Sequence, residues 1–299
     1  MARRRPATTH GVCIVDKPAG VTSHDVVGML RRRFNERQVG HGGTLDPDAT
    51  GVLVVAVGMA TKLLRFVEKT TKRYVGEVVL GTETTTLDAA GEVTATHDMS
   101  GVTIDDARRV IANHLMGDIE QIPPMVSAIK IGGHRLHELA RQGVEVDRPP
   151  RPVTIDRFEI IGEPEPGVFL IDVTCSAGTY VRTLADDLGH LLGGGAHLRH
   201  LRRTAVGEFG IEMADSPDEC ELRPVATAVV GLDRITLSDQ AAQLVANGRV
   251  LPRFPGEGPW AVFTTDDQLI AVYEAFGDRQ AKPACVLPTA RVRSDTPER

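Results

Sequence analysis

The chain has 299 residues, 41% of them hydrophobic and 25% charged, which is typical of an ordinary globular protein. No run approaches 18 uncharged apolar residues, so a membrane-spanning helix is excluded, and no long apolar segment follows the basic start. The four cysteines are far apart and form no C-x-x-C pair, which argues against a disulfide framework and a cysteine-rich zinc site. We therefore expect a cytoplasmic protein.

Charge is unevenly distributed along the chain. The net charge is −6, yet residues 1–73 carry 13 Lys and Arg against 6 Asp and Glu, while the remaining residues carry 21 against 34. Such asymmetry is typical of a surface that binds a polyanion, although a solvated basic surface gives the same pattern. Charge alone does not identify a nucleic-acid-binding protein.

Strand and helix patterns alternate through the first two thirds of the chain. Apolar or alternating runs predict strands at 11–15, 51–58, 72–80, 153–161, 168–175, 199–206 and 208–213. Helical spacing of apolar residues predicts helices at 22–34, 60–66, 103–115 and 179–192. Between them, the glycines and the proline of segment 40–51 predict an irregular loop. Segment 122–146 is predicted to be a long insertion that extends from the fold.

The pattern changes near residue 235, where we place a domain boundary. A helix at 240–247 and compact strands at 260–264, 269–273 and 284–287 predict a small β-rich domain over 236–299. The last eleven or so residues have the composition of a frayed tail. The larger domain is then residues 1–235.

Several kinds of chemistry lack their signatures. The chain has no phosphate-binding loop, no G-x-G-x-x-G before a helix, no G-x-S-x-G and no H-x-E deaminase motif. His190, His197 and His200 lack companion ligands at metal-binding spacing. We therefore expect neither a cofactor nor a metal.

Asp46 lies in the most distinctive loop, which reads His-Gly-Gly-Thr-Leu-Asp-Pro-Asp-Ala-Thr-Gly over residues 41–51. Glycines let a backbone approach a ligand closely, and Pro47 favours an extended presentation of the Asp46 carboxylate. A carboxylate held before a hydrophobic strand suits a nucleophile or a base. An Asx turn closed by Asp-Pro gives the same pattern, so the loop alone does not decide.

Six segments in order add a specific resemblance. They read VDKPAGVTS at 15–23, GHGGTLDPDATG at 40–51, TKRY at 71–74, PPMVSAIK at 123–130, CSAGTYVR at 175–182 and GAHLRHLRR at 195–203. Together they resemble the bacterial tRNA pseudouridine synthase B family over about two thirds of the chain. Residues 236–299 are weakly similar to the small β-barrel, PUA-like RNA-binding domain that ends such enzymes.

The resemblance implies an α+β fold and an isomerisation. We expect a pseudouridine synthase-like, mixed and largely antiparallel sheet with flanking helices and a cleft across its middle. The implied reaction converts the T-loop uridine at tRNA position 55 to pseudouridine without a cofactor. The tRNA T-stem-loop is then the partner, with no membrane and no protein partner, and we expect a monomer. The catalytic aspartate of the family falls on Asp46, which would add to uracil C6, attack the anomeric carbon or act as a base at the ribose.

The resemblance also assigns roles around the flipped base. Tyr74 would stack on it, and His41 would fill the space left in the RNA; the alternatives are a strand core residue and a loop hydrogen-bonding residue. Arg182 would pair with Asp46, lower its pKa and keep it ionised, whereas the alternative is a surface arginine at a helix start. Leu201 would pack against the base or belong to the core.

The remaining assignments concern the walls of the site and the RNA backbone. Lys17 and Tyr180 read as support around the pocket, with a phosphate contact open to Lys17. Segment 122–146 resembles a mobile RNA-clamping segment, although a long solvated loop is the alternative. Within it, the phosphate contacts fall on Lys130, Arg135 and Arg141.

Two residues depart from the family pattern. His137 stands where the clamping segment usually has tyrosine. Asp48 adds a second carboxylate, which we expect to face solvent and which would raise the pKa of Asp46 if it were close.

Two other functions fit part of the pattern. One is a non-catalytic RNA-binding or RNA-folding module, which has no need of the set Asp46, Tyr74 and Arg182. The other is a guide-RNA-dependent pseudouridine synthase, but the chain lacks an extended basic tail.

Overall fold

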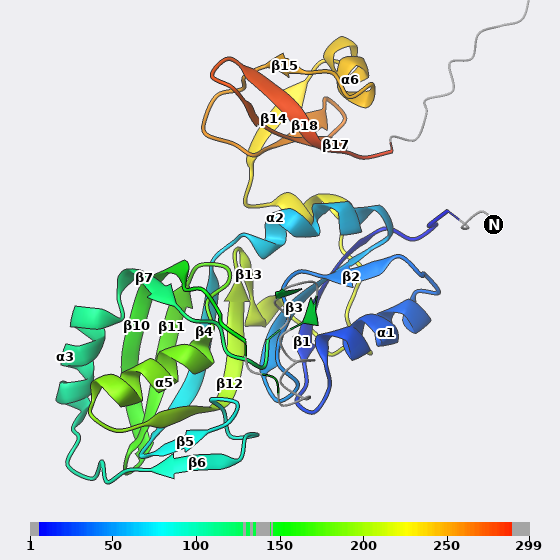
Figure 1. The fold of residues 1–299 in the computed structure, drawn as a ribbon. Helices are drawn as coiled ribbons and strands as arrows, with labels where there is room; N and C mark the ends of the chain where they lie inside the picture. Colours follow the sequence, from blue (N-terminus) through cyan, green and yellow to red (C-terminus); the bar gives the residue numbers. More distant parts are fainter. Residues whose placement is uncertain (1–5, 128–129, 132–133, 136–143, 145, 289–299) are drawn as a thin grey trace, which may run out of the picture.

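A nine-stranded sheet is the main scaffold of this protein, described here from a computed structural model (Figure 1). The described residues are 6–127, 130–131, 134–135, 144 and 146–288. The strands of this sheet are β1 Gly11–Lys17, β2 Val39–His41, β3 Thr50–Val57, β4 Lys72–Leu80, β7 Gly117–Gln121, β10 Arg151–Glu165, β11 Val168–Cys175, β12 Ala196–Val206 and β13 Phe209–Gly210.

The sheet is mixed and largely antiparallel, as predicted. Its strand order is β1-β3-β12-β4-β11-β10-β7, with β2 paired to β3 and β13 to β12. The pair β3–β12 is parallel, whereas the other pairs are antiparallel. This parallel contact joins the two halves of the sheet, and it lies beside the site, because the loop with Asp46 leads into β3 and β12 carries Leu201 and Arg203.

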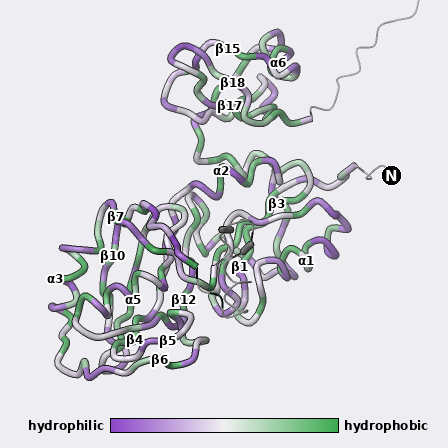
Figure 2. Tube along the Cα trace, viewed as in Figure 1, coloured by the Kyte–Doolittle hydropathy of each residue, from purple (hydrophilic) through white to green (hydrophobic). Residues whose placement is uncertain are grey.

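Helices pack their apolar faces on the apolar surface of the sheet. The helix α1, Ser23–Arg33, begins at a capping box of Thr22 and Asp25 and ends in three arginines, and Figure 2 shows its amphipathic alternation. Helices α3, Ile104–His114, and α5, Val181–Leu191, pack on the other half of the sheet. Each buries one apolar face, which is the main source of helix stability in a folded protein.

A second, five-stranded sheet forms the C-terminal part. Its order is β14-β16-β17-β18-β15, and β14 crosses the boundary that we predicted at 235. The elements are β14 Asp233–Leu237, α6 Asp239–Ala246, β15 Leu251–Pro252, β16 Trp260–Thr264, β17 Leu269–Phe276 and β18 Gln280–Val286. The small C-terminal unit is therefore β-rich, as expected.

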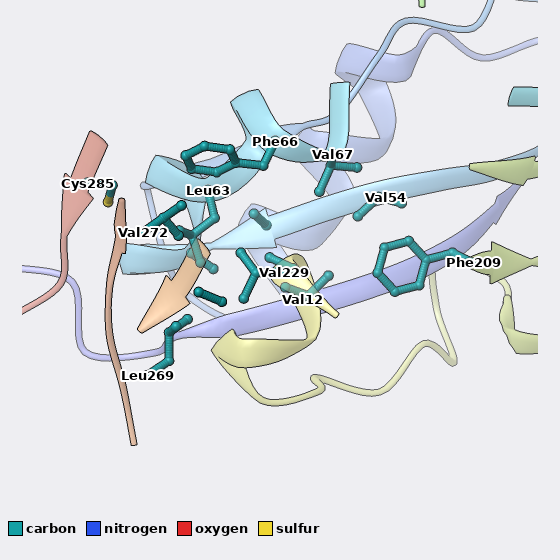
Figure 3. Packing of buried hydrophobic residues seen from close by; sticks show 14 of the residues in the cluster. Val12, Val54, Leu63, Phe66, Val67, Phe209, Val229, Leu269, Val272 and Cys285 are labelled. Carbon is teal, nitrogen blue, oxygen red and sulfur yellow. The ribbon is translucent and has the colours of Figure 1, made fainter. Parts of the chain in front are cut away.

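One apolar cluster joins the two sheets. Leu63 at the end of the 3₁₀ helix η1, Gly58–Leu63, and Phe66 of α2, Leu64–Glu68, pack with Val272 and Leu269 of the small sheet (Figure 3). Val229 of the 3₁₀ helix η3, Val225–Val229, completes the contact. The small sheet therefore docks through buried apolar surface, which stabilises at about 25 cal/mol per Å².

Some predicted boundaries are wrong. Part of the predicted loop 40–51 is strand β2, because Gly40 and His41 bond to β3. Residues 208–213 hold only the short β13 and the 3₁₀ helix η2, Ile211–Met213, instead of a long strand. The pattern also missed β5 Thr82–Thr84, β6 Val93–Thr96, β7 and β14. These strands are short and mostly exposed or half-buried, so they lack the apolar run that marks a buried strand.

Within the described ranges, none of the helices combines the length and the apolarity needed to cross a bilayer.

Gly51 permits the close parallel approach of β3 and β12. Its φ is +102°, and a Cβ built on it would lie 2.1 Å from the Arg203 carbonyl oxygen. We expect Gly51→Ala to lower the free energy of unfolding by more than the roughly 1–3 kcal/mol of backbone strain alone. Urea unfolding checks this, with Gly20→Ala as control, because Gly20 also has a positive φ but no atom within 4 Å of such a Cβ. An equal loss of unfolding free energy in both variants would contradict the close contact between Gly51 and the Arg203 backbone.

Candidate active site

A cavity of about 270 Å³ lies between the loop before β3 and the start of α5. Its walls come from the segments 43–46, 68–74, 127, 176–182 and 201–203. An adjoining cavity of about 460 Å³ shares Asp46, Arg182 and Leu201 with it. The structure thus brings together four predicted residues, namely Asp46, Tyr74, Tyr180 and Arg182, with Leu201 between the two cavities.

The loop that carries Asp46 is held on both sides. Ser23 donates from Oγ to the Leu45 carbonyl at 3.1 Å and accepts the Leu45 N–H at 2.8 Å. The Pro47 carbonyl accepts the Gly20 N–H at 3.0 Å. A backbone fixed immediately before and after Asp46 gives its carboxylate a defined position, which catalysis requires.

Lys17 is a structural support of this loop. It is fully buried, and its Nζ donates to the carbonyls of Pro18, Val21 and Pro47 at 2.7–2.8 Å. An ammonium has three N–H donors, so none is left for a substrate. Burial lowers the pKa of Lys17 to about 8. These contacts fit the supporting role, and they leave the Lys17 ammonium no donor for a phosphate.

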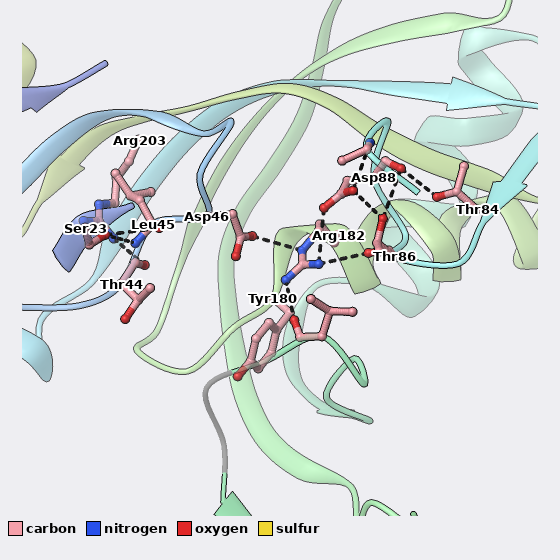
Figure 4. Close-up of polar contacts among 12 residues, drawn as sticks. Ser23, Thr44, Leu45, Asp46, Thr84, Thr86, Asp88, Tyr180, Arg182 and Arg203 are labelled. Atoms are coloured by element: carbon pink, nitrogen blue, oxygen red, sulfur yellow. Dashed lines mark hydrogen bonds and ion pairs between the residues drawn. The ribbon is translucent and has the colours of Figure 1, made fainter. Parts of the chain in front are cut away.

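Arg182 lies at the centre of a polar network (Figure 4). Its side chain is only 5% exposed, and its Nε lies 3.1 Å from Oδ2 of Asp46, so the predicted pair is present. Its Nη1 lies 3.2 Å from Oδ2 of Asp88 and donates to the Thr86 carbonyl, while Nη2 donates to the Val126 carbonyl. The alternative of a surface arginine is wrong.

The pKa of Asp46 shifts in the direction opposite to our expectation. Desolvation raises it most, and the charge of Asp88 raises it further, whereas Arg182 and Lys17 lower it. The side chain is 43% exposed, but toward a cavity partly walled by apolar groups. Arg182 divides its charge between two carboxylates, so it does not outweigh burial. Asp48 is exposed, as expected, and adds a small increase.

Tyr74 and Leu201 border the cavity from neighbouring strands. Tyr74 of β4 packs on the core of the large sheet and also lines the cavity, and its stacking on a flipped base stays a prediction. Burial raises the pKa of its phenol. Leu201 of β12 likewise combines core packing with lining of both cavities.

Tyr180 is positioned by an amide side chain. It precedes α5, and its backbone N–H and carbonyl both bond to Gln121, at 2.8 and 3.0 Å. Burial raises the pKa of the Tyr180 phenol, and a hydrogen bond with Ser127 lowers it. Because Val126 and Ser127 belong to the predicted insertion 122–146, the start of that segment contacts the site.

His41 is not brought into the cavity. It lies in β2, lines neither cavity, and its Nδ1 is buried without a hydrogen-bond partner among the described residues. Burial lowers the pKa of the imidazole, so the ring is neutral near pH 7.

The clamping residues are described only in part. Lys130 lies in β8, Lys130–Ile131, which pairs with β9, His134–Arg135. Arg141 and His137 lie outside the described residues. The phosphate contacts therefore stay predictions.

His190, His197 and His200 are dispersed. His197 is buried against the Thr82 carbonyl, His190 lies near Glu83 and Asp186, and His200 pairs with Glu77. In the part of the chain that the structure describes, no group of three or more His, Cys, Asp or Glu could hold a metal ion.

Sequence reasoning missed Asp88, Arg203 and Lys72. Arg203 is 1% exposed and donates to the carbonyls of Val52, Thr44 and Gly43, so it ties the loop before Asp46 to β12. Arg203 and Lys72 lay inside the resembling segments, which was a usable signal. For Asp88 the sequence offered one indirect signal: a buried guanidinium has more N–H donors than a single aspartate accepts, so Arg182 needed a further partner.

Comparisons with known proteins identify the family of this chain. Family models match residues 31–181 (TruB family pseudouridylate synthase, N-terminal domain), 182–239 (tRNA pseudouridylate synthase B C-terminal domain) and 232–288 (tRNA pseudouridine synthase II, C terminal). A protein of Mycobacteroides abscessus named tRNA pseudouridine synthase B is 44% identical over 95% of this chain and 98% of its own length. A namesake from Mycobacterium tuberculosis is 42% identical over 94% and 97%.

A solved structure supports the fold. A chain in the crystal structure of a Cbf5-Nop10-Gar1 complex superimposes with a TM-score of 0.69 at 26% identity, covering 93% of this chain and 84% of that one. The expected α+β fold with its small C-terminal β unit is thereby confirmed. From the family models and the relatives together, this chain belongs to the TruB family of pseudouridylate synthases and is an isomerase.

Proposed function

We propose that this enzyme converts the T-loop uridine at tRNA position 55 to pseudouridine. The observation that carries the proposal is the Asp46–Arg182 pair, set in a cavity that Tyr74 and Leu201 also line. The RNA class comes from the relatives named tRNA pseudouridine synthase B. Arg182 is buried and contacts a second carboxylate, Asp88, as well as Asp46. A protein that only bound RNA would have no need of this arrangement.

The reaction needs no external group or electron. The bond between ribose C1′ and uracil N1 breaks, the base turns, and C1′ bonds to C5. The C5 proton leaves, and N1 gains one, so atoms and electrons balance. Addition of Asp46 to C6, attack on C1′ and removal of a ribose proton all require its ionised carboxylate.

The target uridine must leave the RNA stack to reach Asp46. Flipping costs a few kcal/mol, and stacking on Tyr74 returns about 1–3 kcal/mol. Leu201 would face the base from β12, and His41, half-buried in β2 outside both cavities, would occupy the space that the base vacates in the RNA. Lys130, Arg135 and Arg141 would hold phosphates, which positions the RNA without reading its sequence.

The pH dependence follows from Asp46. Because its pKa is raised, the rate should increase with pH up to an apparent pKa above that of ordinary aspartate, about 3.9. Asp88→Asn removes a charge that raises this pKa, so the acid limb should shift to lower pH, although the maximal rate falls. Single-turnover rates at pH 4.5–7 check this, and an acid limb at higher pH in the variant would contradict it.

The reaction type is tested by tritium release. A tRNA transcript made with [5-³H]uridine is incubated with the purified chain in EDTA buffer without any guide RNA. We expect one tritium per tRNA in the solvent, and none from a transcript with cytidine at position 55. Binding without release would favour the RNA-folding module, and release only after a guide RNA is added would favour the guide-dependent enzyme.

A further inference from the structure

Lys72 is a buried cation in the cavity wall to which no role has been given. It opens β4 two residues before Tyr74 and is 6% exposed. Alternate residues of a strand face the same side of a sheet, so Lys72 and Tyr74 project from one face of β4. Both line the cavity of about 270 Å³. Lys72 therefore borders the space in which a base stacked on Tyr74 would lie.

Two donors of Lys72 are occupied by backbone. Its Nζ donates to the carbonyls of Glu68 and Thr70, at and just beyond the end of α2. A charged amine has three N–H groups, whereas a neutral amine has two and a lone pair. A third donor toward the cavity therefore exists only while Lys72 is protonated.

Lys72 lies farther along the sheet from Leu201, which borders both cavities, than Tyr74 does, because on β12 Lys72 pairs with Val206 and Tyr74 with Arg203. The ionisable groups that act on it are Arg203 from β12, Cys175 from β11 and Glu68 from α2. Burial and Arg203 have the largest effects on the pKa of Tyr74, and the charges of Cys175 and Asp46 also act on it. A base stacked on Tyr74 with its sugar toward Asp46 would turn its far edge toward Lys72.

Negative charge develops on the carbonyl oxygens of uracil, including O4 on that far edge. When the C1′–N1 bond breaks, its electron pair stays on the uracil and is delocalised over O2 and O4. Addition of a nucleophile to C6 likewise places charge on O4. A fixed donor aimed at such charge in a site shielded from water stabilises the transition state.

We propose that Lys72 donates its third N–H to a carbonyl oxygen of the flipped uracil and stabilises the charge that develops there, keeping its proton throughout. This inference rests on the proposed function, since it needs a flipped uridine in the cavity. It assigns to Lys72 a direct contact with the reacting base.

The kinetic test uses single-turnover rate constants with a tRNA transcript. We expect Lys72→Gln to lower the rate constant on the order of 10²-fold with an unchanged Kd for tRNA, as for loss of one oxyanion donor. Lys69→Gln is the matched control, because Lys69 is exposed and does not line this cavity. A loss confined to tRNA affinity, or an unchanged rate constant, would overturn the proposal.

The pH profile supplies a test that does not depend on a neutral variant folding. Burial and the charge of Arg203 lower the pKa of Lys72 to about 8. Since the third donor is lost on deprotonation, the wild-type rate constant should fall as pH rises through about 8. Lys72→Arg keeps its charge and should make this fall shallower, the remainder coming from Lys17, whose pKa is also lowered to about 8. A wild-type rate that stays flat from pH 7 to 9.5 would overturn the proposal.

A sulfur substitution locates the contact on the base. Transcripts with 4-thiouridine or 2-thiouridine at position 55 replace one oxygen by a weaker acceptor. The replacement that slows the wild type should slow Lys72→Gln much less, and equal slowing in both would contradict the contact. If the wild type makes no pseudouridine at all, the proposed function fails; if it does and Lys72 variants behave like wild type, only this inference fails.

Discussion

The substitution Asp46→Asn is expected to abolish pseudouridine formation, lowering the single-turnover rate on the order of 10⁴-fold or more. The amide is nearly the size of the carboxylate, but it neither attacks carbon nor accepts a proton at neutral pH. Arg182 keeps its contacts with Asp88, Thr86 and Val126, so the cavity should retain its shape. Binding of tRNA, measured by filter retention, should therefore survive.

Asp48→Asn is the matched control for this variant. Asp48 is an exposed carboxylate two residues further along the same loop, and it adds only a small increase to the pKa of Asp46. We expect a rate close to that of wild type. Equal losses in both variants would show that net charge of the loop matters instead of the Asp46 carboxylate.

The substitution Arg182→Lys is expected to lower the rate on the order of 10²-fold although it keeps the charge. One ammonium cannot reproduce a planar fork that contacts Asp46, Asp88 and two carbonyls at once. The carboxylate of Asp46 should lose its fixed orientation. The variant should also unfold more easily, since an unpaired buried polar group costs about 1–3 kcal/mol.

Arg73→Lys is the control that distinguishes the loss of the Arg182 contacts from the effect of replacing any paired arginine by lysine. Arg73 also pairs with a carboxylate, Asp172, but its side chain is 49% exposed and lines neither cavity. Single-turnover kinetics and thermal melting of both variants give the comparison. A wild-type rate for Arg182→Lys would contradict the need for the fork geometry.

The strands that sequence predicts best are those whose residues form a continuous buried apolar run or alternate between apolar and polar. The predicted bounds 72–80, 168–175 and 260–264 coincide with β4, β11 and β16. In contrast, β7 is an edge strand with exposed residues, and its pairing with β10 defines it. A local pattern does not contain that partner, so the strand was not predicted.

The sequence predicted which residues of the candidate site contact each other better than it predicted their burial and their neighbouring charges. The contact between Asp46 and Arg182 followed from the family resemblance and is present. The direction of the pKa shift of Asp46 did not follow, because burial and the second carboxylate, Asp88, come from segments distant in sequence. The full burial of Lys17 was hidden for the same reason, since the carbonyl of Pro47 lies thirty residues away.

Mapping of pseudouridine at every uridine of an unmodified tRNA transcript tests the central claim most directly. The transcript is incubated in EDTA buffer with the wild-type chain or with Asp46→Asn, and tRNA binding is measured in parallel. We expect wild type to modify only the uridine at position 55, and Asp46→Asn to modify none while both bind tRNA. Binding by wild type without pseudouridine, or product formed equally by Asp46→Asn, would contradict the assignment of this cavity as the catalytic site.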